Sequence, residues 1–169
     1  MNRAEGPRSF APSTQKEARL ALAPMRHEHE RAFVEFASSG GRPALLGTDA
    51  ERELRDLFYS LLHHGTESFS ARTEVVLGPS GAVLGFSVES PAGAGRVVWD
   101  MLVDVDRVSF QAEASLAERI VARAEAAGVE QIERALRPGM HRSRLVLAGL
   151  GFLVDEAGHA SKPMSHKVR

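Results

Sequence analysis

The chain has 169 residues, of which 43% are hydrophobic and 25% are charged, and these values are ordinary for one globular domain with a single sizeable core. Lys and Arg number 21 against 22 Asp and Glu, so the charge gives no general attraction to nucleic acid or to an anionic membrane. Cysteine is absent, which excludes disulfides, thiolate metal sites and a cysteine nucleophile.

No apolar run approaches the roughly 20 residues that span a bilayer, and the first residues lack the apolar stretch of a secretory signal. We therefore expect a cytoplasmic protein without a membrane partner. Residues 1–17 are rich in Pro, Ser and Ala and show no clear period. This composition predicts a disordered tail, followed by one domain over residues 18–169.

The predicted elements begin with a strand and two helices. Arg19–Pro24 alternates weakly and stops at proline, which favours a strand, and His27–Ser38 follows as a short helix. Thr48 begins a capping box, and apolar residues then recur at i, i+3, i+4, i+7 and i+8 over Leu54–Leu62. This pattern predicts an amphipathic helix that ends at His63–Gly65.

The middle of the chain predicts a sheet. Glu74–Leu77 and Ala82–Val88 flank the turn Gly78–Gly81 and form a hairpin pattern, and Val97–Asp104 follows as the fourth strand along the chain. A loop at Arg107–Ser115 separates this strand from a helix at Leu116–Ala127. The rest of the chain predicts a strand at Val129–Leu136, a helix at Met140–Ala148, a strand from Phe152 and a final edge strand within Ser161–Arg169.

Three local motifs appear in this order: Gly81-Ala-Val-Leu-Gly-Phe-Ser, Leu116-Ala-x-x-Ile-Val-x-x-Ala-x-x-x-Gly128, and Arg142-Ser-Arg-Leu-Val-Leu-Ala-Gly-Leu-Gly-Phe152. Together with the element order they resemble the GNAT superfamily of acyl-CoA-dependent N-acyltransferases from about residue 18 to residue 165. The resemblance implies an α/β (α+β) fold in which a mixed central sheet of six to seven strands is flanked by about four helices.

The resemblance also implies acetyl-CoA or another acyl-CoA as co-substrate. In this family the fourth strand diverges from the fifth and pairs with the pantetheine arm. The next loop binds the pyrophosphate through backbone N–H groups at a helix N-terminus, where glycine allows close approach. The cofactor-binding residues implied here are Leu102, Val103, Val105, Val108, Gln111, Ala112, Glu113 and Ala114.

The glycines of that loop are missing. The family pattern is Gln/Arg-x-x-Gly-x-Gly/Ala, and one register places its first residue at Val108 and its glycines at Gln111 and Glu113. A second register starts at Gln111 and puts Ala114 and Leu116 at the glycine positions. Neither register restores the motif, which is therefore degenerate.

Glu113 adds a negative charge where phosphate would bind. Like charges about 4 Å apart interact by about 4 kcal/mol at an effective dielectric near 20, a loss of roughly a thousandfold in affinity if the side chain points inward. That loss of affinity is avoided if the Glu113 side chain points outward, or if Arg107 or Arg119 compensates its charge. Alternatively, Ser115 and Glu118 form a capping box and the loop is only a connector.

For catalysis the resemblance implies a carboxylate base on the fourth or fifth strand. Asp100 and Asp104 are the candidates, because strand alternation puts both on one face. Asp106, Glu130 and Glu133 are weaker candidates. The family's tyrosine acid and its preceding asparagine fall at Leu147 and Met140, so both polar groups are absent.

Tyr59, the only tyrosine, is expected in the core or a groove, and His141 is the nearest substitute acid. His27, His29 and the His63-His64 pair have no spacing that completes a metal site. A basic cluster suggests either contact with the phosphate of CoA or, more simply, a solvated helix face: Arg134, Arg137, Arg142 and Arg144.

Two functions follow. The first is an N-acetyltransferase-like protein that transfers an acyl group from acetyl-CoA, or another acyl-CoA, to a small-molecule amine or a protein lysine. The second is a catalytically inactive GNAT-fold domain that acts as a binding or regulatory module. A nucleic-acid partner is not expected, and a homodimer is left open.

Overall fold

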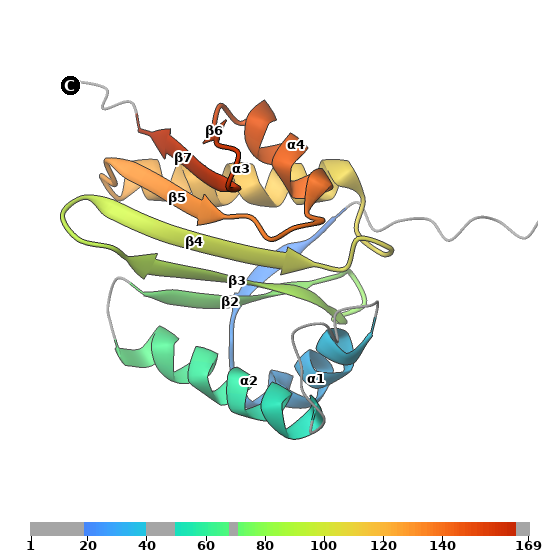
Figure 1. The fold of residues 1–169 in the computed structure, drawn as a ribbon. Helices are drawn as coiled ribbons and strands as arrows, with labels where there is room; N and C mark the ends of the chain where they lie inside the picture. The colour runs from blue at the N-terminus through green and yellow to red at the C-terminus, as the bar shows by residue number, and fades with distance from the viewer. Residues whose placement is uncertain (1–18, 40–49, 68–70, 165–169) are drawn as a thin grey trace, which may run out of the picture.

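The structure is a computed structural model that describes residues 19–39, 50–67 and 71–164. In these residues one seven-stranded mixed sheet runs in the order β1-β2-β3-β4-β5-β7-β6. Helices α1 and α2 cover one face of the sheet, and α3 and α4 cover the other (Figure 1). The expected α/β (α+β) fold is therefore confirmed.

The strands are β1 (Ala21–Pro24), β2 (Arg72–Leu77), β3 (Val83–Pro91), β4 (Arg96–Val103), β5 (Gln131–Ala135), β6 (Leu153–Val154) and β7 (His159–Pro163). The helices are α1 (Glu30–Ser38), preceded by the 3-10 turn η1 (His27–His29), α2 (Ala50–Glu67), α3 (Phe110–Ala126) and α4 (His141–Gly149).

The pairing of β4 with β5 is short. Strands β1 to β4 pair antiparallel in chain order, whereas β4 and β5 are parallel. Their register joins Arg96–Val98 to Gln131–Glu133 and goes no further, so the strands separate from Trp99 onward. β7 lies between β5 and β6 and is antiparallel to both.

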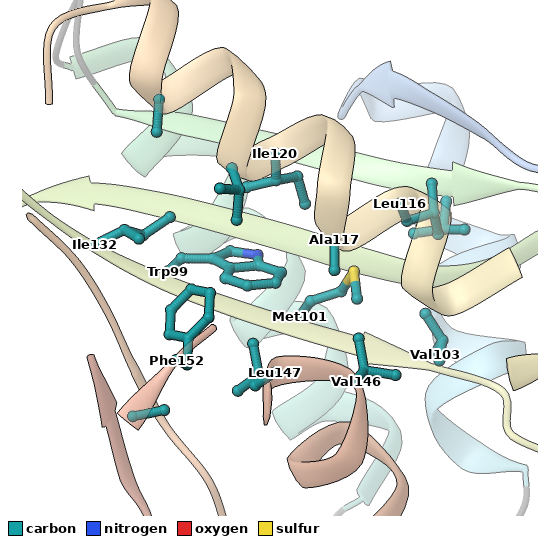
Figure 2. Packing of buried hydrophobic residues seen from close by; sticks show 14 of the residues in the cluster. Trp99, Met101, Val103, Leu116, Ala117, Ile120, Ile132, Val146, Leu147 and Phe152 are labelled. Carbon is teal, nitrogen blue, oxygen red and sulfur yellow. The ribbon is translucent and has the colours of Figure 1, made fainter. Parts of the chain in front are cut away.

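Two hydrophobic clusters hold the layers together. On the α3/α4 face, Trp99, Met101 and Val103 of β4 pack with apolar side chains of both helices, as Figure 2 shows. On the α1/α2 face, Phe33 and Phe86 pack with Phe58 and their neighbours. Because alternate β4 residues face opposite layers, Asp100 and Leu102 lie on the α1/α2 side.

A charged clamp also joins α3 to the sheet. Arg123 of α3 donates to both carboxylate oxygens of Glu74 on β2, at 3.0 and 2.7 Å, and to Glu89 on β3. Both acids are buried. Burial raises the pKa of Glu89 above its ordinary value, and the Arg123 charge opposes this shift only in part.

Two helix boundaries differ from the sequence prediction. α3 begins at Phe110 rather than Leu116, because Ser109 caps it and the following residues form helix readily. Most of the predicted loop is therefore helix, and Ser115 with Glu118 lies inside it, so the capping box there was wrong. α2 continues past His63–Gly65 to Glu67.

The last predicted strand is also placed differently. β7 was expected at an edge, but β6 is the edge strand and β7 is internal. β7 is internal because β6, which follows α4, pairs with the side of β7 opposite β5. The predicted tail at residues 1–17, the cap at Thr48 and the end of Ser161–Arg169 lie outside the described residues.

Alanine substitutions at Gly85 on β3 and at Gly149 at the end of α4 should have opposite effects on the free energy of unfolding. A Cβ on Gly85 would lie 2.2 Å from the Leu102 carbonyl oxygen, whereas one on Gly149 meets nothing within 4 Å. We expect Gly85→Ala to lower the free energy of unfolding by about 1–3 kcal/mol, and Gly149→Ala to raise it by about 0.5–1 kcal/mol. Urea unfolding measures both, and equal effects of the two substitutions would contradict the β3–β4 packing described here.

Glu89→Gln tests the buried clamp. Because the pKa of Glu89 is raised in the folded state, its carboxyl favours folding at pH values below its ordinary pKa. This contribution to the free energy of unfolding is lost as the pH rises through the pKa of the folded state. The Tm of Glu89→Gln relative to the unmodified chain should therefore increase from about pH 4 to about pH 7, by no more than about 4 °C. Glu156→Gln, at an exposed position, is the matched control. A difference that shrinks with rising pH would contradict the assignment.

Candidate functional site

A cavity of about 410 Å³ lies between α1, α2 and the sheet. Its wall is almost entirely apolar, and one end carries two charged side chains, Asp100 of β4 and Arg137 of the β5–α4 connection. The apolar lining comes from three elements besides β4: Phe33 and Ala37 of α1, Leu54, Leu57 and Leu61 of α2, and Phe86 and Val88 of β3. Apolar cavities with a few polar groups at one end are typical ligand sites.

Asp100 accepts hydrogen bonds from two donors, and a further guanidinium lies nearby. Its Oδ1 accepts the Met101 backbone N–H at 2.8 Å and lies 3.9 Å from Nε of Arg134. Its Oδ2 accepts from Nη2 of Arg137 at 2.9 Å. The predicted base therefore does line the cavity, with both of its oxygens engaged.

Arg134 of β5 is the unexpected residue of the site. Its side chain is 0% exposed, its Nη2 donates to the Met101 carbonyl at 2.5 Å, and its guanidinium lies 4.8 Å over the Trp99 ring. Burial lowers the pKa of this arginine, and the Asp100 charge opposes the shift. Nε and Nη1 have no hydrogen-bond acceptor in the described part of the chain.

The two contacts meet on one peptide segment. Met101 lies where β4 has separated from β5, and its N–H and carbonyl point to the same side of the strand. Asp100 satisfies the first group and Arg134 the second. Side chains of this protein thus bond a peptide segment of the diverging fourth strand, the strand that the resemblance pairs with the pantetheine arm, although Met101 was not among the cofactor residues expected from the sequence.

The loop after β4 is held by its own contacts. The Asp104 carbonyl accepts from Arg107 and Val108, and its Oδ1 accepts from the Asp106 N–H at 3.1 Å. Asp104 therefore stabilises a tight turn. It lies on the α1 side, as the alternation predicts, but lines a different and smaller pocket from Asp100, beside Phe36.

Arg142 of α4 closes this loop from the other side. Its Nη1 donates to the Val105 carbonyl at 3.1 Å and its Nη2 to the Ser109 carbonyl at 2.8 Å. Ser109 in turn caps α3, because its Oγ accepts the Ala112 N–H at 3.1 Å. The loop and the first turn of α3 are thus fastened to the start of α4.

Glu113 points neither into a phosphate site nor outward to solvent. Its carboxylate is 1% exposed and lies between α3 and α4. Oε1 accepts from Ser143 Oγ at 2.8 Å, and Oε2 lies 2.7 Å from Nε of Arg142. Arg142, rather than Arg107 or Arg119, is the cation that compensates this charge.

The predicted cofactor residues do not form one exposed surface. Val103, Val108 and Ala112 are buried in the α3/α4 core, and Ala114 packs against it. Leu102 lines the cavity on the opposite face, while Val105 and Gln111 are exposed. A loop without glycine keeps side chains at every position, and most of these are used for packing.

The basic cluster is also not a single solvated face. Arg134 is fully buried and Arg142 is largely buried, whereas Arg137 and Arg144 are exposed. Alternation on β5 carries the missed signal, since Arg134 shares the buried face with Ile132. The four arginines are close together in the sequence, but the fold places two of them in buried or largely buried positions and two at the surface.

No general acid is evident around the cavity in the described residues. Leu147 is buried in the core. Tyr59 is partly exposed rather than in the core, and its hydroxyl donates to Glu30 at 2.6 Å, which raises the pKa of the phenol. His141 begins α4 and is exposed.

Two negative findings also apply to the described ranges. There, no three His, Asp or Glu side chains gather as a metal site would require. The described helices include none with the length and apolar character needed to cross a membrane.

Removing Arg142 should destabilise the protein through Glu113. Arg142→Met leaves a buried carboxylate without its cation, and we expect a loss of about 3–5 kcal/mol in the free energy of unfolding. Adding Glu113→Gln should recover most of it, because Ser143 can still hydrogen-bond the amide. A double-mutant cycle by urea unfolding measures the coupling, and simple additivity would argue against the pair.

No protein-family model matches the chain, and no curated protein matches it in sequence. Solved structures do match it. A GNAT-family acetyltransferase from Staphylococcus aureus Mu50 is 10% identical with a TM-score of 0.66, and the match covers 87% of this chain and 100% of that one. A phosphinothricin acetyltransferase from Sinorhizobium meliloti, solved with AcCoA, is 16% identical with a TM-score of 0.63, over 88% and 90% of the two chains.

A spermidine N-acetyltransferase from Vibrio cholerae, solved as a dodecamer, is 10% identical with a TM-score of 0.63, and the match covers 89% of this chain and 96% of that one. Identities this low establish architecture and leave activity open. The matches nevertheless extend over nearly the whole of both chains. This chain therefore has the fold of the GNAT superfamily.

Proposed function

We propose that this chain is a GNAT-fold domain that binds a small ligand in the cavity between α1, α2 and the sheet, and that it does not take up acyl-CoA in the family's manner. One observation carries the proposal. The N–H and carbonyl of Met101, in the gap between β4 and β5, already have Asp100 and Arg134 as partners.

Entry of a pantetheine arm would require Arg134 to leave Met101. The guanidinium is fully buried, and removing a partner from a buried charge costs about 3–5 kcal/mol. That is a loss of roughly a hundredfold to a thousandfold or more in affinity. The gap is thus better suited to the arginine than to a cofactor.

The loop gives independent support. An anion at a helix N-terminus needs free backbone N–H groups, but the Ala112 N–H is already bonded to Ser109. Glu113 adds a negative charge in the first turn of α3, and Arg142 only balances it. Little positive potential is left there for a pyrophosphate.

A second function is acyl transfer from acetyl-CoA, or another acyl-CoA, to a small amine or a protein lysine. The observation in its favour is that Asp100 lines the cavity, where a base would face an acceptor. Asp104 is the alternative base and lies against α1. Oδ2 of Asp100 already accepts a hydrogen bond from Arg137.

Calorimetric titration with acetyl-CoA separates the two functions. We expect no heat of binding from the unmodified chain or from Glu113→Gly alone. Arg134→Leu together with Glu113→Gly should gain measurable binding, since one change frees the Met101 carbonyl and the other removes the buried charge. Arg134→Leu by itself should keep the fold at a cost of about 1–3 kcal/mol for the unpaired Met101 carbonyl, because Asp100 retains its hydrogen bonds from Met101 and Arg137.

Arg144→Gln is the control, because this arginine is exposed and its side chain donates to the Asp155 carbonyl. Binding of acetyl-CoA to the unmodified chain at one site per molecule would overturn the proposal and favour acyl transfer. A melting curve for each variant excludes unfolding as the cause of a negative result.

A further inference from the structure

Building on the proposed function, we infer that the cavity between α1, α2 and the sheet selects an amphipathic carboxylate, a molecule with an apolar chain or ring and one carboxylate group. The apolar wall and the charge at its Arg137 end together define this class of ligand.

The wall sets the apolar part of the ligand. Phe33 and Phe86 pack against each other at 5.4 Å between ring centroids, and the leucines of α2 face them across the cavity. Leu57 is 40% exposed although it lines this space, so a ligand that covered it would bury apolar surface. A ring or a short chain fits such a wall better than a polar molecule does.

The charges at the end of the cavity do not cancel. Among the described residues, Asp100 is the one acid that lines it, and two arginines approach that carboxylate, Arg137 at 2.9 Å and Arg134 at 3.9 Å. One negative and two positive groups leave a net charge of +1. Each oxygen of this carboxylate already accepts a hydrogen bond from within the chain, so a ligand cation would have to share it with a donor of the protein.

Arg137 can donate to a ligand. Its side chain is 44% exposed and lines the cavity, and in the described part of the chain only its Nη2 has a partner. The remaining N–H groups of a guanidinium suit a carboxylate, which accepts two parallel hydrogen bonds. Such an ion pair offsets the cost of removing a carboxylate from water.

The same charge count disfavours an amine. A protonated amine at this end would lie beside the guanidinium of Arg137 and compete with it for Asp100, and the buried Arg134 guanidinium lies 3.9 Å from the same carboxylate. A polyamine, which carries several positive charges, would be repelled more strongly. The ligand class inferred here is therefore opposite in charge to the spermidine named for the Vibrio cholerae structure.

The test uses three probes of one shape on the full chain: 4-phenylbutyrate, 4-phenylbutanol and 4-phenylbutylamine. Calorimetry should give the carboxylate about tenfold tighter binding than the alcohol, and the amine the weakest. Methyl NMR locates the probe, with shifts expected at Leu54, Leu57, Leu61 and Val88.

Arg137→Gln should remove the tenfold preference for the carboxylate and leave alcohol binding unchanged. Arg144→Gln, an exposed arginine outside the cavity, should change neither. Amine binding as tight as carboxylate binding, or an unaltered preference in Arg137→Gln, would overturn the inference but not the ligand site itself. Shifts only at other methyls would overturn both, because the probe would then bind outside the cavity. If no probe binds below about 10 mM, the proposed ligand site fails as well.

Discussion

The separation of β4 from β5 is the constraint on which the site depends. The strands pair only through Arg96–Val98 and Gln131–Glu133, and beyond that point the β4 peptide groups face a gap. Buried peptide groups need partners. Asp100 and Arg134 supply them for Met101 from within the chain. The protein's own side chains therefore fill the hydrogen-bonding positions in the gap between β4 and β5.

The contacts of Asp100 and Arg134 with Met101 link the two sides of the sheet. Arg134 is buried beside Trp99 in the α3/α4 layer and reaches Asp100, whose carboxylate faces the α1/α2 layer. Asp100 then holds Arg137 at the end of the cavity. One buried arginine therefore influences both the closed gap and the charge of the open cavity. Architecture shared with acetyltransferases is compatible with this change, because activity depends on site residues rather than on fold.

Local patterns predicted most of the secondary structure. The i, i+3, i+4 repeat identified α2, and the turn at Gly78–Gly81 identified the β2–β3 hairpin. The start of α3 was misplaced because a family loop was assumed where Ser109 caps a helix. Alternation put Asp100 and Asp104 on one side, yet it could not tell that one lines the cavity and the other holds a turn.

By itself, the sequence determined the element order, the two apolar faces and the loss of the loop glycines, since periodicity and residue type are local properties. Only the tertiary structure decided where the charges go. Glu113 meets Arg142, which is 29 residues away by the numbering, and Arg134 meets the Met101 carbonyl across 33 residues. The packing of α3, α4 and the separated strands determines these partners, because a buried charge must pair with a group that the fold places nearby.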